Sequence, residues 1–259
     1  MRLRLSSKII LLTLMVLAFS TSISSAPADL GLTLPNIDIK VGSSEQNLTP
    51  AITIFLIITV LSLAPSFLML MTSFTRIAVV LSFVKQAIGA RQAPPNQVVV
   101  ALALFLTILI MFPVFSNVYN KAIVPYNSGT IGYEKAVERT WNEFKTFMLR
   151  EIVNHKNQDN IYMLAQSTNI EIKDINDTPF QVLIPAFALS ELEISFKMGI
   201  LIYLPFIIVD MVVASILLSM GMMMIPPVMI SMPFKILLFV LVNGWDLLIG
   251  SLVRSFSGG

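Results

Sequence analysis

The sequence predicts an all-α membrane-complex protein of two kinked apolar helical hairpins with a small helical extracytoplasmic insertion between them. Hydrophobic residues make up 56% of the 259 residues, only 12% are charged, and the mean hydropathy is +0.82. An ordinary globular domain carries about 25% charged residues. The apolar residues also gather in long runs on both sides of a polar middle third. Part of the surface must therefore face lipid or partner chains.

Composition excludes several classes of function. The net charge is +2 and no basic stripe indicates binding to nucleic acid. The chain has no cysteine, which excludes disulfides and thiolate chemistry. We find no glycine-rich phosphate loop, zinc-ligand spacing or Ser-His arrangement, so we expect neither catalysis nor a cofactor. The one histidine, His155, lies in a polar stretch, which predicts a solvated surface side chain.

Residues 1–28 have the pattern of a secretory signal peptide. Three basic residues precede an eleven-residue apolar core that ends at Phe19, and small residues follow. We expect cleavage just before Pro27 or Asp29, which places the mature N-terminus outside the cytoplasm. An uncleaved anchor is the alternative, but eleven helical residues cover only about half the hydrocarbon thickness. Residues 29–49 are predicted to be a polar tether.

The first apolar hairpin is predicted over residues 50–119. Its first helix lies in an uncharged run over 46–75, with a kink at Pro65. Its second helix is expected from Val98 to Val118. Both segments are long enough to cross a membrane.

The connection at residues 73–96 is basic and periodic. It contains Arg76, Lys85 and Arg91 and no acidic residue, so the positive-inside rule places it on the cytoplasmic side. Asn96 follows two prolines and is expected to cap the next helix. An apolar stripe at helical spacing predicts that the connection is a buried or interfacial helix. The stripe consists of Ile77, Val80, Leu81, Val84 and Ile88.

Residues 120–183 are predicted to form a small water-exposed helical insertion on the outer side. Between Lys121 and Asp177 there are seven basic and eight acidic residues. Apolar residues at spacings of four, four, three and four predict an amphipathic helix within it. They are Tyr133, Val137, Trp141, Phe144 and Met148.

The second apolar hairpin is predicted over residues 184–259. Ser190 followed by Glu193 matches a capping box, which predicts a helix start at Ser190. The helix is expected to run through Pro205 to about Met220, and a single final helix from about 233 to 254. The turn between them, at residues 221–227, is rich in methionine and ends in proline, which favours a soft surface facing a partner over core packing. The methionines just before it and within it are Met220, Met222, Met223 and Met224.

Charged residues in this hairpin need an explanation, because each mid-membrane charge costs about 2.5 to 3.5 kcal/mol on insertion scales. Glu191 and Glu193 can be read as charges that compensate the dipole at a helix start. Asp210 lies among apolar residues and is expected to have a partner, in the same chain or in a neighbouring subunit. Folding the hairpin about its turn predicts three opposite-charge pairs. They are Asp210 with Lys235, Glu193 with Arg254, and Lys197 with Asp246.

Eight short motifs occur in a fixed order along the chain. They are Ser73-Phe74-Thr75-Arg76, Ala93-Pro94-Pro95-Asn96-Gln97, Leu102-Ala103-Leu104-Phe105-Leu106-Thr107, Pro185-Ala186-Phe187, Ser190-Glu191-Leu192, the methionine turn, Pro233-Phe234-Lys235 and Gly244-Trp245-Asp246. Together they resemble the FliP family of flagellar biosynthetic proteins, over about residues 46–257 apart from the insertion. The sequence departs from the family at Asn243, where Asp is common, and at Ser195, where Ala or Gly is usual.

The resemblance implies a pore-forming subunit of the flagellar type III protein-export gate, in the inner membrane at the basal body. It implies a homo-oligomer with FliQ-like and FliR-like subunits, in contact with membrane lipid and with exported unfolded flagellar proteins. The methionine turn would act as a gasket that closes the pore. In such assemblies the hairpins bend and stack partly above the membrane, so four apolar segments need not be four simple spans.

Two other functions remain open from the sequence. One is an ion-coupled membrane transporter that uses Asp210 and Glu193 as a proton relay. The other is the equivalent subunit of a virulence injectisome, whose counterpart is the R-type export-apparatus subunit. The leader and the length resemble the flagellar branch more closely.

Overall fold

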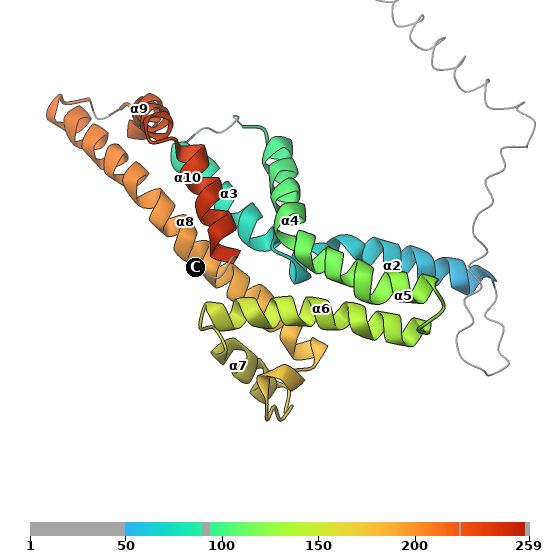
Figure 1. Ribbon diagram of the computed structural model, residues 1–259. Helices are drawn as coiled ribbons and strands as arrows, with labels where there is room; N and C mark the ends of the chain where they lie inside the picture. Colours follow the sequence, from blue (N-terminus) through green and yellow to red (C-terminus); the bar gives the residue numbers. More distant parts are fainter. Residues whose placement is uncertain (1–49, 90–93, 223, 257–259) are drawn as a thin grey trace, which may run out of the picture. The chain divides into compact units, whose positions relative to one another are not determined.

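A computed structural model describes residues 50–89, 94–222 and 224–256. The predicted leader and tether, and Met223, lie outside the described residues. The described part of the chain is helical and contains no strand (Figure 1). The expected all-α fold is confirmed.

The first hairpin is built differently from the sequence prediction. Helix α2 spans Pro50–Met71 and α3 spans Phe74–Ile88, and the chain turns by 83° between the end of α2 and α3. Every member of the predicted stripe in α3 is buried, which confirms a buried helix. Helix α4 packs mainly against α3 and α6. The connection, and not the first apolar run, is therefore the hairpin partner of α4.

Helix α4 ends at Val118 as predicted, but the helical chain continues beyond that residue. It spans Asn96–Val118 and continues through a π-helical turn, η1 (Tyr119–Ile123), into α5 (Val124–Asn127). The capping prediction for Asn96 is wrong. Asn96 is the first helical residue, and its Oδ1 accepts a hydrogen bond of 2.5 Å from Lys85 Nζ. The nearby ammonium at the end of α3 engages the side chain that a cap would need.

The insertion is helical but is not a separate layer. It contains α6 (Tyr133–Asn154), α7 (Asp159–Ser167) and a short 3₁₀ turn, η2 (Ile175–Asp177). The second half of α6 packs against α8, where Met148 and Ile152 are fully buried. The expected amphipathic helix is therefore present, and only its last turns belong to the core.

Helix α8 begins earlier than predicted. It spans Phe180–Ser219, so Ser190 lies ten residues inside it, and the predicted helix start is wrong. The Ser190 hydroxyl accepts a hydrogen bond of 2.9 Å from Asn157 Nδ2. Apolar side chains before Ser190, such as Phe187, are buried among α6 and α7, and this packing extends the helix upstream. The predicted end near Met220 is right.

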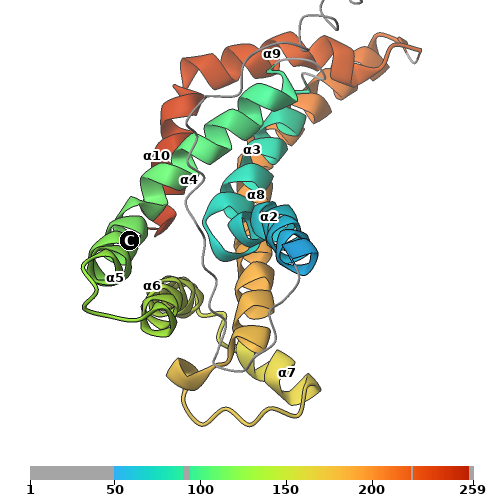
Figure 2. The same cartoon turned by 90° about the vertical axis from the view of Figure 1, so that its right-hand side faces the viewer.

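The predicted final helix is two helices. Helix α9 spans Pro227–Leu241 and α10 spans Gly244–Phe256, with a bend of 64° between them (Figure 2). Asn243 lies at the bend with a φ of 50°, a left-handed conformation that asparagine tolerates better than most residues. The break could not be read from the hydropathy, because both helices are apolar.

Gly244 is required for the bend, since a Cβ there would lie 2.3 Å from the Phe239 ring. We expect Gly244→Ala to lower the free energy of unfolding by about 1–3 kcal/mol, the usual cost of overpacking. Thermal unfolding in detergent, followed through Trp245, measures this. Gly132→Ala is the control, because a Cβ at Gly132 meets no atom within 4 Å. Equal melting of both variants would contradict the prediction.

Apolar surface remains uncovered on the longest helices. The helical segments 96–127 and 180–219 are each long and apolar enough to cross a membrane. The number of possible spans rises to four if the end of α2 with α3, and α9 with α10, are each counted as one bent span. Only 28% and 11% of their most apolar stretches are buried within the chain. Lipid or partner chains must cover the rest.

Candidate functional site: buried ion pairs and a methionine turn

Arg76 is fully buried at the meeting point of four helices. Its Nε and Nη2 donate to the Glu191 carboxylate at 2.8 and 2.6 Å, and Nη2 also reaches Glu151 Oε2 at 3.3 Å. Its Nη1 donates to the carbonyl oxygen and Oγ of Ser255 at 3.1 and 3.0 Å. The guanidinium carbon lies 3.7 Å from the centre of the Phe256 ring. One side chain of α3 thus joins α6, α8 and α10.

Two carboxylates share this guanidinium, and both are fully buried. Burial raises the pKa of Glu151 above its usual value, and the charges of Arg76 and Arg150 oppose that rise. Arg150 lies 3.2 Å from Glu151, but its side chain is 52% exposed. The interpretation of Glu191 as a charge at a helix start is wrong, because Glu191 lies in the interior of α8.

The prediction of a solvated surface histidine is also wrong. His155 is partly buried, and its Nε2 lies 3.9 Å from Glu151 Oε2. Burial lowers the pKa of His155, and the charge of Arg76 lowers it further. The polar residues next to His155 in the sequence do not indicate that it lies beside the buried Arg76–Glu151 pair.

The contact between Arg76 and Glu151 corrects the predicted topology. The charge pattern placed Arg76 on the cytoplasmic side and the insertion that holds Glu151 on the outer side. Atoms 3.3 Å apart cannot lie on opposite sides of a hydrocarbon layer about 30 Å thick. Arg76 is a buried partner of two carboxylates, so it does not count as a loop charge.

Asp210 and Lys235 are brought together within one chain. Lys235 Nζ lies 2.6 Å from Asp210 Oδ2, and Ser231 Oγ donates to Asp210 Oδ1. The Lys235 side chain is 2% exposed and that of Asp210 26%. Ser231 was missed in the sequence, although its spacing of four from Lys235 puts both on one face of α9.

The other two expected pairs are wrong. Glu193 pairs with Lys197 one turn further along α8, at 2.7 Å, and both side chains are exposed on this chain. Asp246 and Arg254 are exposed, and neither forms an ion pair with any residue that the structure describes. The projected register fails for these residues because α10 turns away from the line of α9.

The methionine turn between α8 and α9 is exposed. Gly221 has a φ of 76°, which turns the chain at the end of α8, and Pro227 starts α9. Met220 is 67% exposed, Met222 38% and Met224 97%. Side chains that packed in the core would be buried, whereas these are available to a partner.

The described residues define an all-α membrane protein whose helices are tied together by buried ion pairs and whose long apolar faces point outward. Comparison with known proteins then places the chain in the FliP family. The family model matches residues 57–252, a range that holds Arg76, both carboxylates, the Asp210–Lys235 pair and the methionine turn.

Relatives named flagellar biosynthetic protein FliP support this membership. The relative from Aquifex aeolicus is 48% identical over 86% of this chain and 92% of its own length. The relative from Treponema denticola is 46% identical over 86% of this chain and 83% of its own length. The relative from Bacillus subtilis is 45% identical over 85% of this chain and 98% of its own length.

Proposed function

We propose that the chain is a pore-forming structural subunit of the flagellar type III protein-export gate in the inner membrane, and not an enzyme. It passes unfolded flagellar proteins and has an extracytoplasmic mature N-terminus. Family membership and the flagellar names of the relatives support the flagellar system over an injectisome. The observation that carries the pore role is the exposed methionine turn at the tip of the α8–α9 hairpin.

The exposed apolar faces of the long helices indicate that the chain works in an assembly and not as a monomer. Apolar side chains recur along the outer side of α8 at helical spacing, from Phe196 through Ile200, Leu204 and Ile208. Such a row fits beside a helix of a second copy. The proposed assembly is a homo-oligomer that also contains FliQ-like and FliR-like subunits and is surrounded by membrane lipid.

Thioether side chains suit a gasket. They are apolar enough to exclude ions, and their unbranched chains can part around a passing polypeptide. The Asp210–Lys235 pair joins α8 to α9 below the turn. The turn can therefore change shape while the two helices stay in register.

Alanine at Met222, Met223 and Met224 is expected to raise the ion leak of cells several-fold while the complex still assembles. Leak is measured as sodium- or dye-dependent growth arrest and by conductance of the purified complex. The control replaces Met211 and Met229 with alanine, because both are exposed but lie on helices outside the turn. A turn variant that assembles and stays as tight as the control would rule out the gasket.

A proton relay from Asp210 to Glu193 has less support. The two carboxylates are seventeen residues apart on α8, which is about 25 Å of helix. Each already has a cation of its own, Lys235 and Lys197 respectively.

A further inference from the structure

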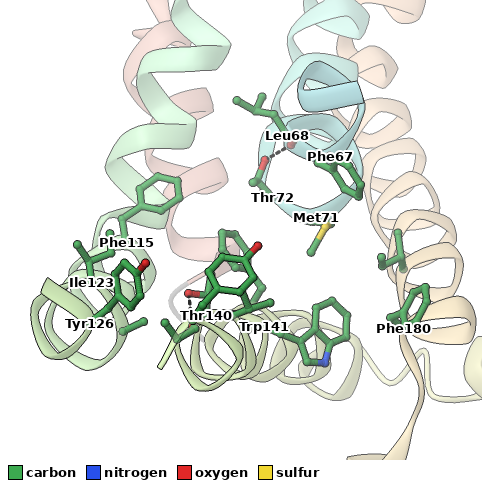
Figure 3. A pocket seen from close by; sticks show the side chains of 16 residues that line it. Phe67, Leu68, Met71, Thr72, Phe115, Ile123, Tyr126, Thr140, Trp141 and Phe180 are labelled. Carbon is green, nitrogen blue, oxygen red and sulfur yellow. Dashed lines mark hydrogen bonds between the residues drawn. The ribbon is translucent and has the colours of Figure 1, made fainter. Parts of the chain in front are cut away.

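An apolar pocket of about 820 Å³ lies between α2, the end of α4, η1, α5, α6 and the start of α8 (Figure 3). The first half of the amphipathic stripe of α6 lines it, including Val137 and Trp141, and Trp141 also packs against the edge of the core. Phe67 and Met71 of α2 lie on another side of it, and Phe180 of α8 on a third. An unfilled apolar space of this size is unfavourable, so something covers it.

The lining offers little to a polar occupant. The Thr140 hydroxyl donates to the Ala136 carbonyl at 2.9 Å, and that of Thr72 to the Leu68 carbonyl, so both are engaged within their own helices (Figure 3). Water is stable in a cavity only where it finds two or more polar partners. An inserted irregular protein segment would bring backbone amides that also need partners.

The walls are held in place by polar contacts beside the pocket. Lys121 Nζ lies 2.6 Å from Glu143 Oε1, and Asn117 Nδ2 donates to Glu143 Oε2 at 3.0 Å. Arg139 Nη1 donates to the Lys121 carbonyl at 2.9 Å. These contacts join α6 to the end of α4 and to the π-helical turn η1, and π-helical turns occur often at functional sites. The pocket is thus a formed feature of the fold.

We propose that this pocket binds an acyl chain of a membrane phospholipid. A hydrocarbon chain has no polar group to satisfy and can follow a lining contributed by six elements. A cavity of about 150 Å³ holds one benzene, so this pocket has room for roughly thirty carbon atoms. Tyr126, Tyr133 and Trp141 line it, and Tyr and Trp are the residues enriched where membranes meet water. The helix α4–α5 that forms one wall is itself long and apolar enough to cross a membrane.

Quenching of Trp141 by brominated acyl chains tests the proposal in the purified complex, reconstituted in phosphatidylcholine nanodiscs. The chain has two tryptophans, so Trp245→Phe leaves Trp141 as its reporter. Subtracting the emission of the complex that carries both Trp141→Phe and Trp245→Phe removes the partner subunits. Because Trp141 itself lines the pocket and a pocket ligand is largely buried against the lining, we expect brominated lipid to lower Trp141 emission to less than about half.

Filling the pocket supplies the matched variant. Ala136 lines it, whereas Ala101 is exposed on α4 outside it, so Ala136→Phe should reduce the quenching and Ala101→Phe should not. The measurement on the parent stands even where Ala136→Phe fails to assemble. Quenching by aqueous iodide in place of brominated lipid would show a water-filled pocket and overturn the proposal. Protection from both quenchers would show a protein occupant and overturn it equally.

Discussion

Replacing Arg76 with alanine is expected to prevent the folded chain from accumulating in the membrane. The change leaves Glu151 and Glu191 buried without their shared cation and releases Ser255 and Phe256 of α10. Removing one partner of a buried pair costs about 3–5 kcal/mol. A domain has only about 5–15 kcal/mol of stability in total. The amount of detergent-extracted complex, measured by immunoblot after size exclusion, gives the result.

Arg150→Ala is the matched control for this change. Arg150 binds the same Glu151 carboxylate at 3.2 Å, but its side chain is half exposed, and exposed pairs contribute about 0–1 kcal/mol. The amount of complex from Arg76→Lys should lie between those from Arg76→Ala and Arg150→Ala, because lysine keeps the charge but loses the bidentate contact with Glu191. If Arg76→Ala yields as much complex as Arg150→Ala, the cluster does not hold the helices together.

Breaking the Asp210–Lys235 pair is expected to have the second largest effect. Asp210→Ala leaves the Lys235 ammonium buried without an anion, and Lys235→Ala leaves the carboxylate with Ser231 alone. We expect either change to abolish assembly and swimming motility. Glu193→Ala and Lys197→Ala are the matched controls, because that pair is nearly as short but exposed. Both control variants should assemble.

Exchanging the two charges tests the pairing itself. Asp210→Lys combined with Lys235→Asp restores an ion pair in the same place, so assembly should partly return. Recovery is incomplete because the Ser231 hydroxyl then faces an ammonium and no longer donates to a carboxylate. Single variants that assemble and export as the parent does would refute the pairing. Single variants that assemble but lose proton-dependent export would instead make Asp210 a relay group.

Local periodicity predicted the elements well where packing and pattern agree. The stripe of α3 is buried as expected, and the end of α8 falls where glycine and methionine replace the apolar run. The Asp210–Lys235 contact followed from counting residues outward from the turn. That count holds along α9, because the helix is continuous as far as Leu241.

The errors arise where distant contacts override the local pattern. Ser190 has the spacing of a cap but is buried beside Asn157, from a segment thirty-three residues away. The bend at Asn243 depends on a left-handed backbone and on the Phe239 ring, neither of which periodicity reports. The ion pairs predicted for Arg254 and Asp246 are wrong for the same reason, because both residues follow the bend.

The Arg76 cluster was missed although the sequence holds a signal for it. Arg76 lies four residues before Val80, on the apolar face of α3, and Glu151 lies three residues after Met148, on the apolar face of α6. A charge on the buried face of a helix needs a partner of opposite sign. The positive-inside rule counts charges without asking which face they occupy.

The order of synthesis gives the Arg76 cluster a consequence for biogenesis. Glu151, Glu191 and Ser255 follow Arg76 by 75, 115 and 179 residues. At about 5–20 residues per second, the ribosome reaches Ser255 on the order of ten to forty seconds after Arg76. Until then the guanidinium lacks its full set of partners, and α3 cannot be buried without cost. We therefore expect the cluster to be completed only after α10 has been made, which leaves apolar faces of the newborn chain open to a chaperone or to neighbouring subunits during that interval.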